Sequence, residues 1–237
     1  PEAIKMAPLV LELRKRPGIE SLCCVTAQHR QMLDSVLEIF GVKPDYDLAI
    51  MEPGQTLFDI TRKILDGMKP ILERERPQAV LVHGDTSTAF AAGLAAFYLG
   101  VPVGHVEAGL RTYDITAPFP EEFNRQAVDS LSTWFFAPTE GAKEALLRES
   151  KNPDKIYVTG NTAIDALQRT VRQDYTHPEL AWAQEKGARF VLLTAHRREN
   201  LGEPMLHIFR GIRRVLDEHP EVRVLYPIHK NPLVRQA

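Results

Sequence analysis

Short apolar runs alternate with amphipathic segments along most of the chain. Residues 79–82, 102–106 and 134–137 have the length and composition of buried strands, and each is followed by a stretch with helical spacing of apolar positions. Strands that alternate with helices in this way form a parallel sheet with helices on both faces. The pattern therefore predicts an α/β fold.

The same pattern gives the extent of each expected element. Strands are expected at residues 21–26, 79–82, 102–106, 134–137, 155–158, 190–194 and 222–228. Helices are expected at residues 1–16, 55–76, 88–99, 120–131, 139–149 and 204–218, with two more ending near Phe40 and Val171. Residues 172–187 are polar and break the rhythm, so we predict a linker there.

This break divides the chain into two predicted domains. Residues 1–171 would form the first domain, and residues 172–237 the linker and the opening of a second α/β domain. The chain starts at Pro1 in a helical pattern and stops within an apparent new helix after His229. We therefore expect the first strand of the first domain, and the remainder of the second domain, to lie outside this sequence.

The bulk composition narrows the class of protein. Hydrophobic residues make up 44% of the chain and charged residues 25%, which is typical of a soluble globular protein. The net charge of -2 argues against a nucleic-acid partner, since such proteins normally carry a basic excess. The longest uncharged stretch, residues 86–106, is interrupted by glycine and proline, so no membrane association is expected. Cys23 and Cys24 are adjacent and have no other cysteine to pair with, which fits a cytoplasmic location.

Acidic residues follow or lie near the ends of predicted strands in three loops. Asp85 follows the strand at 79–82, Glu107 follows the strand at 102–106, and Glu121 lies in the next loop, at the start of a predicted helix. The carboxyl ends of parallel strands meet at one edge of a sheet, where ligands bind in α/β proteins. We therefore expect these carboxylates to lie at one site, where they could move protons.

A fourth loop adds cations. His196 follows the predicted strand at 190–194, and Arg197 and Arg198 come directly after it. Guanidinium groups bind phosphate oxygens in a bidentate manner, so paired arginines suit a diphosphate. Together with the acids, this loop indicates chemistry on a phosphorylated small molecule.

Each acid also has a structural interpretation that the sequence leaves open. Asp85 could cap the helix that follows it. Glu107 could form a salt bridge with Arg111. Glu121 could favour the dipole of its helix and pair with Arg125 at i, i+4 spacing.

Metal and dinucleotide sites are not indicated. The histidines show no metal-ligand spacing, and His83-Gly84-Asp85 resembles a metallophosphatase motif without the partner clusters of that class. Neither a Walker loop nor a G-x-G-x-x-G fingerprint is present. No metal and no cofactor are therefore expected.

Seven segments, in order along nearly the whole chain, resemble the bacterial UDP-N-acetylglucosamine 2-epimerases, particularly the non-hydrolysing type. They are residues 1–10, 25–30, 82–86, 105–112, 118–126, 159–162 and 194–200. The resemblance implies two doubly wound, Rossmann-like domains as in GT-B glycosyltransferases, with the second incomplete in this chain and the substrate in the cleft between them. It also implies a homodimer.

The implied activity is the interconversion of UDP-GlcNAc and UDP-ManNAc without a metal or cofactor. In the family, UDP leaves by elimination with loss of the C2 proton, which gives 2-acetamidoglucal, and UDP then adds back with C2 inverted. The product would supply ManNAc for cell-surface polysaccharide.

The family's functional residues match positions in this chain. The catalytic positions are Asp85, Glu107, Glu121 and His196, with Glu107 and Glu121 expected to handle the C2 proton and Asp85 to support them. The expected substrate-binding positions are Lys5, Arg111, Arg125, Arg197 and Asn200. A second UDP-GlcNAc, acting as an activator, would contact Gln28, His29, Gln31 and Gln55, although Gly54 stands where some members carry arginine.

Three rival functions remain open from the sequence. A hydrolysing UDP-GlcNAc 2-epimerase would release ManNAc and UDP. A GT-B glycosyltransferase would use a UDP-sugar and an acceptor, without exchange of the C2 proton. A non-catalytic module would only bind a sugar nucleotide.

Overall fold

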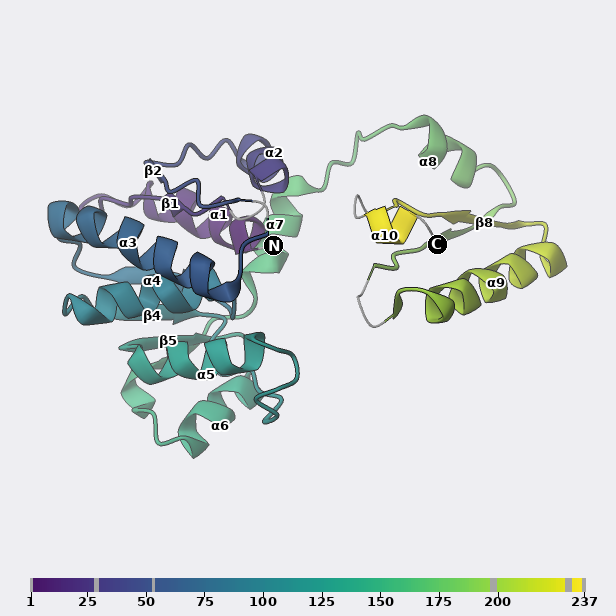
Figure 1. Ribbon diagram of the computed structural model, residues 1–237. Coiled ribbons are helices and arrows are strands. Elements are labelled where there is room, and N and C mark those ends of the chain that lie inside the picture. Colours follow the sequence, from purple (N-terminus) through teal and green to yellow (C-terminus); the bar gives the residue numbers. More distant parts are fainter. Residues whose placement is uncertain (1, 28–29, 53, 197–199, 229–231, 236–237) are drawn as a thin grey trace. The chain divides into compact units, whose positions relative to one another are not determined.

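The computed structural model describes residues 2–27, 30–52, 54–196, 200–228 and 232–235 (Figure 1). The chain divides into two compact units, Pro1–Val171 and Arg172–Ala237.

The first unit is built on a parallel sheet, as the sequence predicts. Its strands β3 (Val80–His83), β4 (Val103–Val106), β5 (Trp134–Ala137) and β6 (Ile156–Val158) lie side by side in chain order, and all neighbours are parallel. His83 pairs with Val106 and Val106 with Phe136, so the loops after these strands leave the same edge of the sheet.

A second, two-stranded parallel sheet pairs β1 (Cys24–Val25) with β2 (Tyr46–Asp47). The sequence predicted a strand at 21–26 but not β2. The two residues of β2 are too few to show the alternation or the apolar run by which strands are recognised.

Helices pack against these strands and against one another. They are α1 (Glu2–Leu13), α2 (Arg30–Phe40), α3 (Leu57–Glu75), α4 (Ser87–Tyr98), α5 (Glu121–Leu131), α6 (Glu140–Arg148) and α7 (Thr162–Thr170), with a 3-10 turn at Pro153–Lys155. Helix α4 packs against both α3 and α5, and α1 packs against α2 and α7 (Figure 1). Helix α1 ends at Leu13, before the predicted end at residue 16.

Small side chains allow α4 to lie in the middle of this core. Its buried positions are Ala89, Ala91, Ala92, Gly93, Ala95 and Ala96. A Cβ atom at Gly93 would lie 3.1 Å from Leu131 Cδ1, so α4 and α5 approach closely there. Side chains of α3, including Ile64 and Leu72, complete the largest apolar cluster of the unit. This core fixes the edge of the sheet from which the acidic loops emerge.

The second unit contains strands β7 (Arg189–Leu192) and β8 (Val222–Leu225), which are parallel, and helices α8 (Pro178–Ala183), α9 (Glu203–Glu218) and α10 (Pro232–Arg235). Helix α8 lies within residues 172–187, which the sequence predicts as a linker without a helix. Pro178 stands in the first turn, where its fixed φ favours a helix start. Within the described residues, no helix is long and apolar enough to cross a membrane.

Candidate active site

Glu107 lies in a tight turn directly after β4. Its backbone N–H and that of Ala108 both donate to Phe136 O, at 3.0 and 3.1 Å. Its φ is +68°, a value that is uncommon for residues other than glycine and that persists only where the surroundings impose it. The fold therefore holds Glu107 in a fixed place at the edge of the sheet.

The Glu107 carboxylate is bound by two residues far away in the sequence. Lys5 Nζ lies 2.6 Å from Oε2, and Asn161 Nδ2 donates to the same oxygen at 3.0 Å. Among the residues that the structure describes, none donates a hydrogen bond to Oε1. Lys5, not Arg111, is thus the cation paired with Glu107, and the predicted Glu107–Arg111 salt bridge is wrong.

Asn161 was missed as a site residue. It caps α7, since its Oδ1 accepts from Ala163 N at 2.9 Å, and its Nδ2 donates to Glu107 Oε2. Its position in the sequence could have indicated this role, because Asn161 follows the predicted strand at 155–158 just as Asp85 and Glu107 follow theirs. The side-chain NH2 of a capping asparagine stays free to donate to another residue.

His83, the last residue of β3, lies beside the same carboxylate. Its side chain is 4% exposed, and Nε2 is 3.8 Å from Glu107 Oε2. Neither ring nitrogen has a hydrogen-bond partner among the described residues. Burial lowers the pKa of His83 to about 4, since the attraction of the nearby Glu107 charge is opposed by Lys5 and does not offset it. The ring is therefore neutral near pH 7.

This buried neutral histidine predicts a pH dependence of stability. Its pKa is about 4 in the folded protein and 6.5 ordinarily, so the unfolded chain binds more protons between these values. The free energy of unfolding should fall as pH drops from 6.5 to 4, and His83 should account for on the order of 3 kcal/mol of that loss. Trp134 fluorescence, in a Trp182→Phe background, reports unfolding of the first unit alone.

The substitution His83→Gln should remove that part of the pH dependence. His207→Gln, which changes an exposed histidine in α9, is the matched control and should leave it intact. Equal slopes for wild type and His83→Gln between pH 4 and 6.5 would contradict a neutral His83.

Asp85 follows β3 and is paired with Arg125 of α5. Burial raises the pKa of the Asp85 carboxyl; Arg125 lowers it, and the charges of Glu121 and Glu107 raise it further. The three predicted acids therefore lie close enough to influence one another. The cap of α4 is Thr86, whose Oγ1 accepts from Ala89 N at 3.2 Å, so the capping interpretation of Asp85 is wrong.

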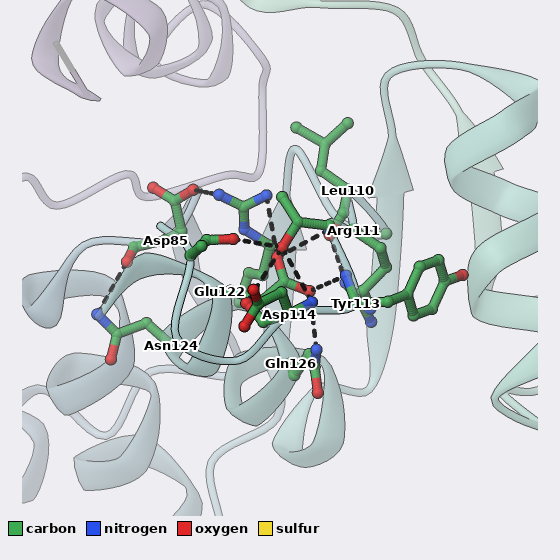
Figure 2. A network of polar contacts seen from close by, with 12 residues as sticks. Asp85, Leu110, Arg111, Tyr113, Asp114, Glu122, Asn124 and Gln126 are labelled. Atoms are coloured by element: carbon green, nitrogen blue, oxygen red, sulfur yellow. Dashed lines mark hydrogen bonds and ion pairs between the residues drawn. The ribbon is translucent and has the colours of Figure 1, made fainter. Parts of the chain in front are cut away.

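Glu122, not Glu121, anchors the loop before α5. Its carboxylate is fully buried and accepts hydrogen bonds from the backbone N–H groups of Thr112 and Tyr113, both at 3.1 Å, and from Gln126 (Figure 2). Burial raises its pKa, but these hydrogen bonds lower it more. Glu122 is therefore structural and ionised.

The Glu121 carboxylate has no hydrogen bond or ion pair with any described residue. The i, i+4 pair with Arg125 that the sequence allowed does not form, because Arg125 contacts Asp85 and Glu122 instead. The Glu121 carboxylate is thus available for chemistry. The Arg125 guanidinium is held by two other carboxylates, those of Asp85 and Glu122. Whether Arg125 also binds substrate stays a prediction.

Arg111, which the sequence predicts to contact the substrate, is buried among protein partners. Its guanidinium is 1% exposed and donates to both oxygens of Glu149, to Asp129 and to Leu110 O. These contacts outweigh the effect of burial and raise its pKa. The sequence could not show this, since Asp129 reaches Arg111 from α5 and Glu149 from the residue after α6.

The remaining predicted residues are distributed over both units. His196 is exposed and Asn200 half-buried in the second unit, while Arg197 lies outside the described residues. For the activator site, Gln31 is exposed in the first turn of α2 and the Gln55 amide donates to Ile50 O. Gln28 and His29 also lie outside the described residues. The described part of the chain holds no cluster of three or more metal-ligating side chains.

Comparison with known proteins gives a consistent result. The sequence model of the UDP-N-acetylglucosamine 2-epimerase family matches residues 11–237. A UDP-N-acetylglucosamine 2-epimerase of Bacillus subtilis is 57% identical over 237 residues, which is 100% of this chain and 62% of the relative. The chain thus spans less than two thirds of that relative's length.

Solved structures agree in fold. The crystal structure of UDP-GlcNAc 2-epimerase from Neisseria meningitidis bound to UDP-GlcNAc has a TM-score of 0.90 and 50% identity, and covers 100% of this chain and 65% of its own. An S. aureus MnaA–UDP structure has a TM-score of 0.91 and 53% identity, and covers 99% of this chain and 62% of its own.

Proposed function

The chain belongs to the UDP-N-acetylglucosamine 2-epimerase family, and we propose that it interconverts UDP-GlcNAc and UDP-ManNAc. The observation that supports this most directly is the Glu107 carboxylate. One of its oxygens is held by Lys5 and Asn161, and the other accepts no hydrogen bond from a described residue. A carboxylate fixed in this way is suited to take a proton from a bound sugar.

The proposed reaction begins with removal of the C2 proton and departure of UDP. The electrons of the C2–H bond form a C1=C2 double bond as the C1–O bond breaks, which gives 2-acetamidoglucal and UDP. In the return step, a proton adds to C2 on the opposite face and a UDP oxygen attacks C1. One of Glu107 and Glu121 would remove the proton from one face of C2, and the other would donate a proton to the opposite face.

Two features of the first unit support this division of roles. Glu121 has no hydrogen bond or ion pair with a described residue and Glu107 accepts through Oε2 alone, whereas Glu122 is held by backbone N–H groups and Asp85 is paired with the Arg125 guanidinium. Asp85 would support the pair through its charge and its position.

Cations must stabilise the departing diphosphate. Lys5 is 26% exposed beside Glu107, and Arg197 and Asn200 would also bind the substrate, with His196 acting in catalysis. Arg111 would act only indirectly, because its side chain is 1% exposed and four of its five N–H groups donate to Glu149, Asp129 and Leu110 O. The proposal includes a second UDP-GlcNAc that acts as an activator and contacts Gln28, His29, Gln31 and Gln55. It also includes a homodimeric state and a cytoplasmic location.

Proton NMR of UDP-GlcNAc with the full-length protein in D2O tests this function. The expected result is UDP-ManNAc with deuterium at C2, since the proton exchanges with solvent during elimination. Release of free ManNAc and UDP would assign the hydrolysing reaction instead. Transfer of the sugar to an acceptor with the C2 proton retained would indicate a glycosyltransferase.

A further inference from the structure

Asp129, on α5, is a buried carboxylate that the proposed reaction does not use. Its side chain is fully buried. Oδ1 lies 2.6 Å from His105 Nδ1, and Oδ2 accepts from Arg111 at 2.7 Å and from Gly109 N at 3.2 Å. Burying a carboxylate is costly unless it is hydrogen-bonded, and here both oxygens have hydrogen-bond partners.

The partners of Asp129 belong to the loops that carry the acids. Gly109 lies two residues after Glu107, in the same turn. His105 Nε2 lies 2.8 Å from Gly84 O, a carbonyl that can only accept, so the ring donates to the residue before Asp85. Asp129 itself is on the helix whose first turn contains Glu121.

A single carboxylate therefore joins three segments that are far apart in the sequence. Both ring nitrogens of His105 are engaged, which fixes the orientation of the ring between Asp129 and Gly84. Burial raises the pKa of Asp129, but the hydrogen bond and charge of His105 and the charge of Arg111 lower it more, so the carboxylate is ionised. The Glu149 carboxylate binds Nε and Nη2 of Arg111 and so helps to hold the guanidinium beside Asp129.

We infer that Asp129 is the positioning residue that sets the relative placement of Asp85, Glu107 and Glu121. This inference rests on the proposed epimerase function. Its effect on the reaction is through geometry, since a misplacement of about 1 Å can lower a rate about 100-fold. A loss of placement should therefore lower kcat and leave substrate affinity nearly unchanged.

Two substitutions at this position in the full-length protein separate placement from charge. Asp129→Ala removes every contact and should lower kcat about 100-fold with KM changed less than about threefold. Asp129→Asn can rebuild the network, because its oxygen accepts from Gly109 and Arg111 and its amide donates to a neutral His105. Its kcat should recover to within about tenfold of wild type.

A control and a second measurement exclude a merely structural effect. Leu72→Ala truncates a buried side chain of α3 in the large apolar cluster and should lower thermal stability while leaving kcat of the folded enzyme unchanged. Hydrogen exchange of the backbone at residues 84–86 and 107–111 should become faster in Asp129→Ala and not in Leu72→Ala.

The outcomes distinguish this inference from the function on which it rests. Wild-type kcat in Asp129→Ala, or a rise in KM alone, would overturn the positioning role. Unchanged exchange at 84–86 and 107–111 would overturn it even if the protein had no epimerase activity. Faster exchange together with an inactive wild type would retain the positioning role and reject the epimerase function.

Discussion

The substitution Glu107→Gln is expected to lower kcat at least about 1,000-fold while changing the affinity for UDP-GlcNAc less than about threefold. Glutamine has the shape of glutamate, and its oxygen can accept from both Lys5 and Asn161. What it lacks is the basicity needed to remove the C2 proton. The expected effect is therefore on the chemical step and not on binding.

Two measurements check this expectation on the full-length protein. Exchange of the C2 proton in D2O, followed by NMR, reports proton transfer, and calorimetric titration with UDP-GlcNAc reports binding. Glu75→Gln is the matched control, because Glu75 also accepts a hydrogen bond from a distant side chain, the Tyr46 hydroxyl, but at the end of α3. Its kcat should remain that of wild type.

A Glu107→Gln enzyme that retains wild-type kcat would remove Glu107 from proton transfer. A large loss of affinity with unchanged kcat would make it a binding residue instead. In that case the ion pair with Lys5, at 2.6 Å, would be the feature that matters.

The fold was predictable because its signals are local. Runs of apolar residues gave β3 to β6 within about a residue or two, and the helix after each strand followed from its spacing. Thr86 and Thr139 cap the helices that follow them, and threonine is a residue type typical of helix starts. The sequence missed β2 and α8, which are too short to show a period, and it extended α1 and the strand at 222–228 three residues too far.

The sequence allowed the acidic residues of the candidate site to be predicted, but not the residues that bind them. Asp85, Glu107 and Glu121 share a position after a strand or at the start of a helix, and parallel pairing brings such positions to one edge. The partners Lys5 and Asn161 approach Glu107 from α1 and from the start of α7, and only packing decides that. Sequence spacing suggested Arg111 for Glu107 and Arg125 for Glu121, but both arginines bind carboxylates on other elements.

Gly109→Ala is expected to destabilise the first unit by about 3 kcal/mol. Gly109 has φ +84°, and a Cβ atom built on it would lie 2.3 Å from Ala142 O and 2.9 Å from Leu146 Cγ. Ala142 O is part of the backbone of α6, so it cannot rotate away as a side chain would. Either the turn after Glu107 or helix α6 must move.

Gly100→Ala is the matched control for this effect. Gly100 follows α4 with φ +70°, but no heavy atom lies within 4 Å of its Cβ position. Its substitution adds only the cost of a left-handed conformation, about 1 kcal/mol. Urea unfolding followed by Trp134 fluorescence, in the Trp182→Phe background, compares the two. Equal losses of stability would mean that α6 yields to the new methyl group, and Glu107 would then be held by its Lys5 and Asn161 contacts more than by the turn.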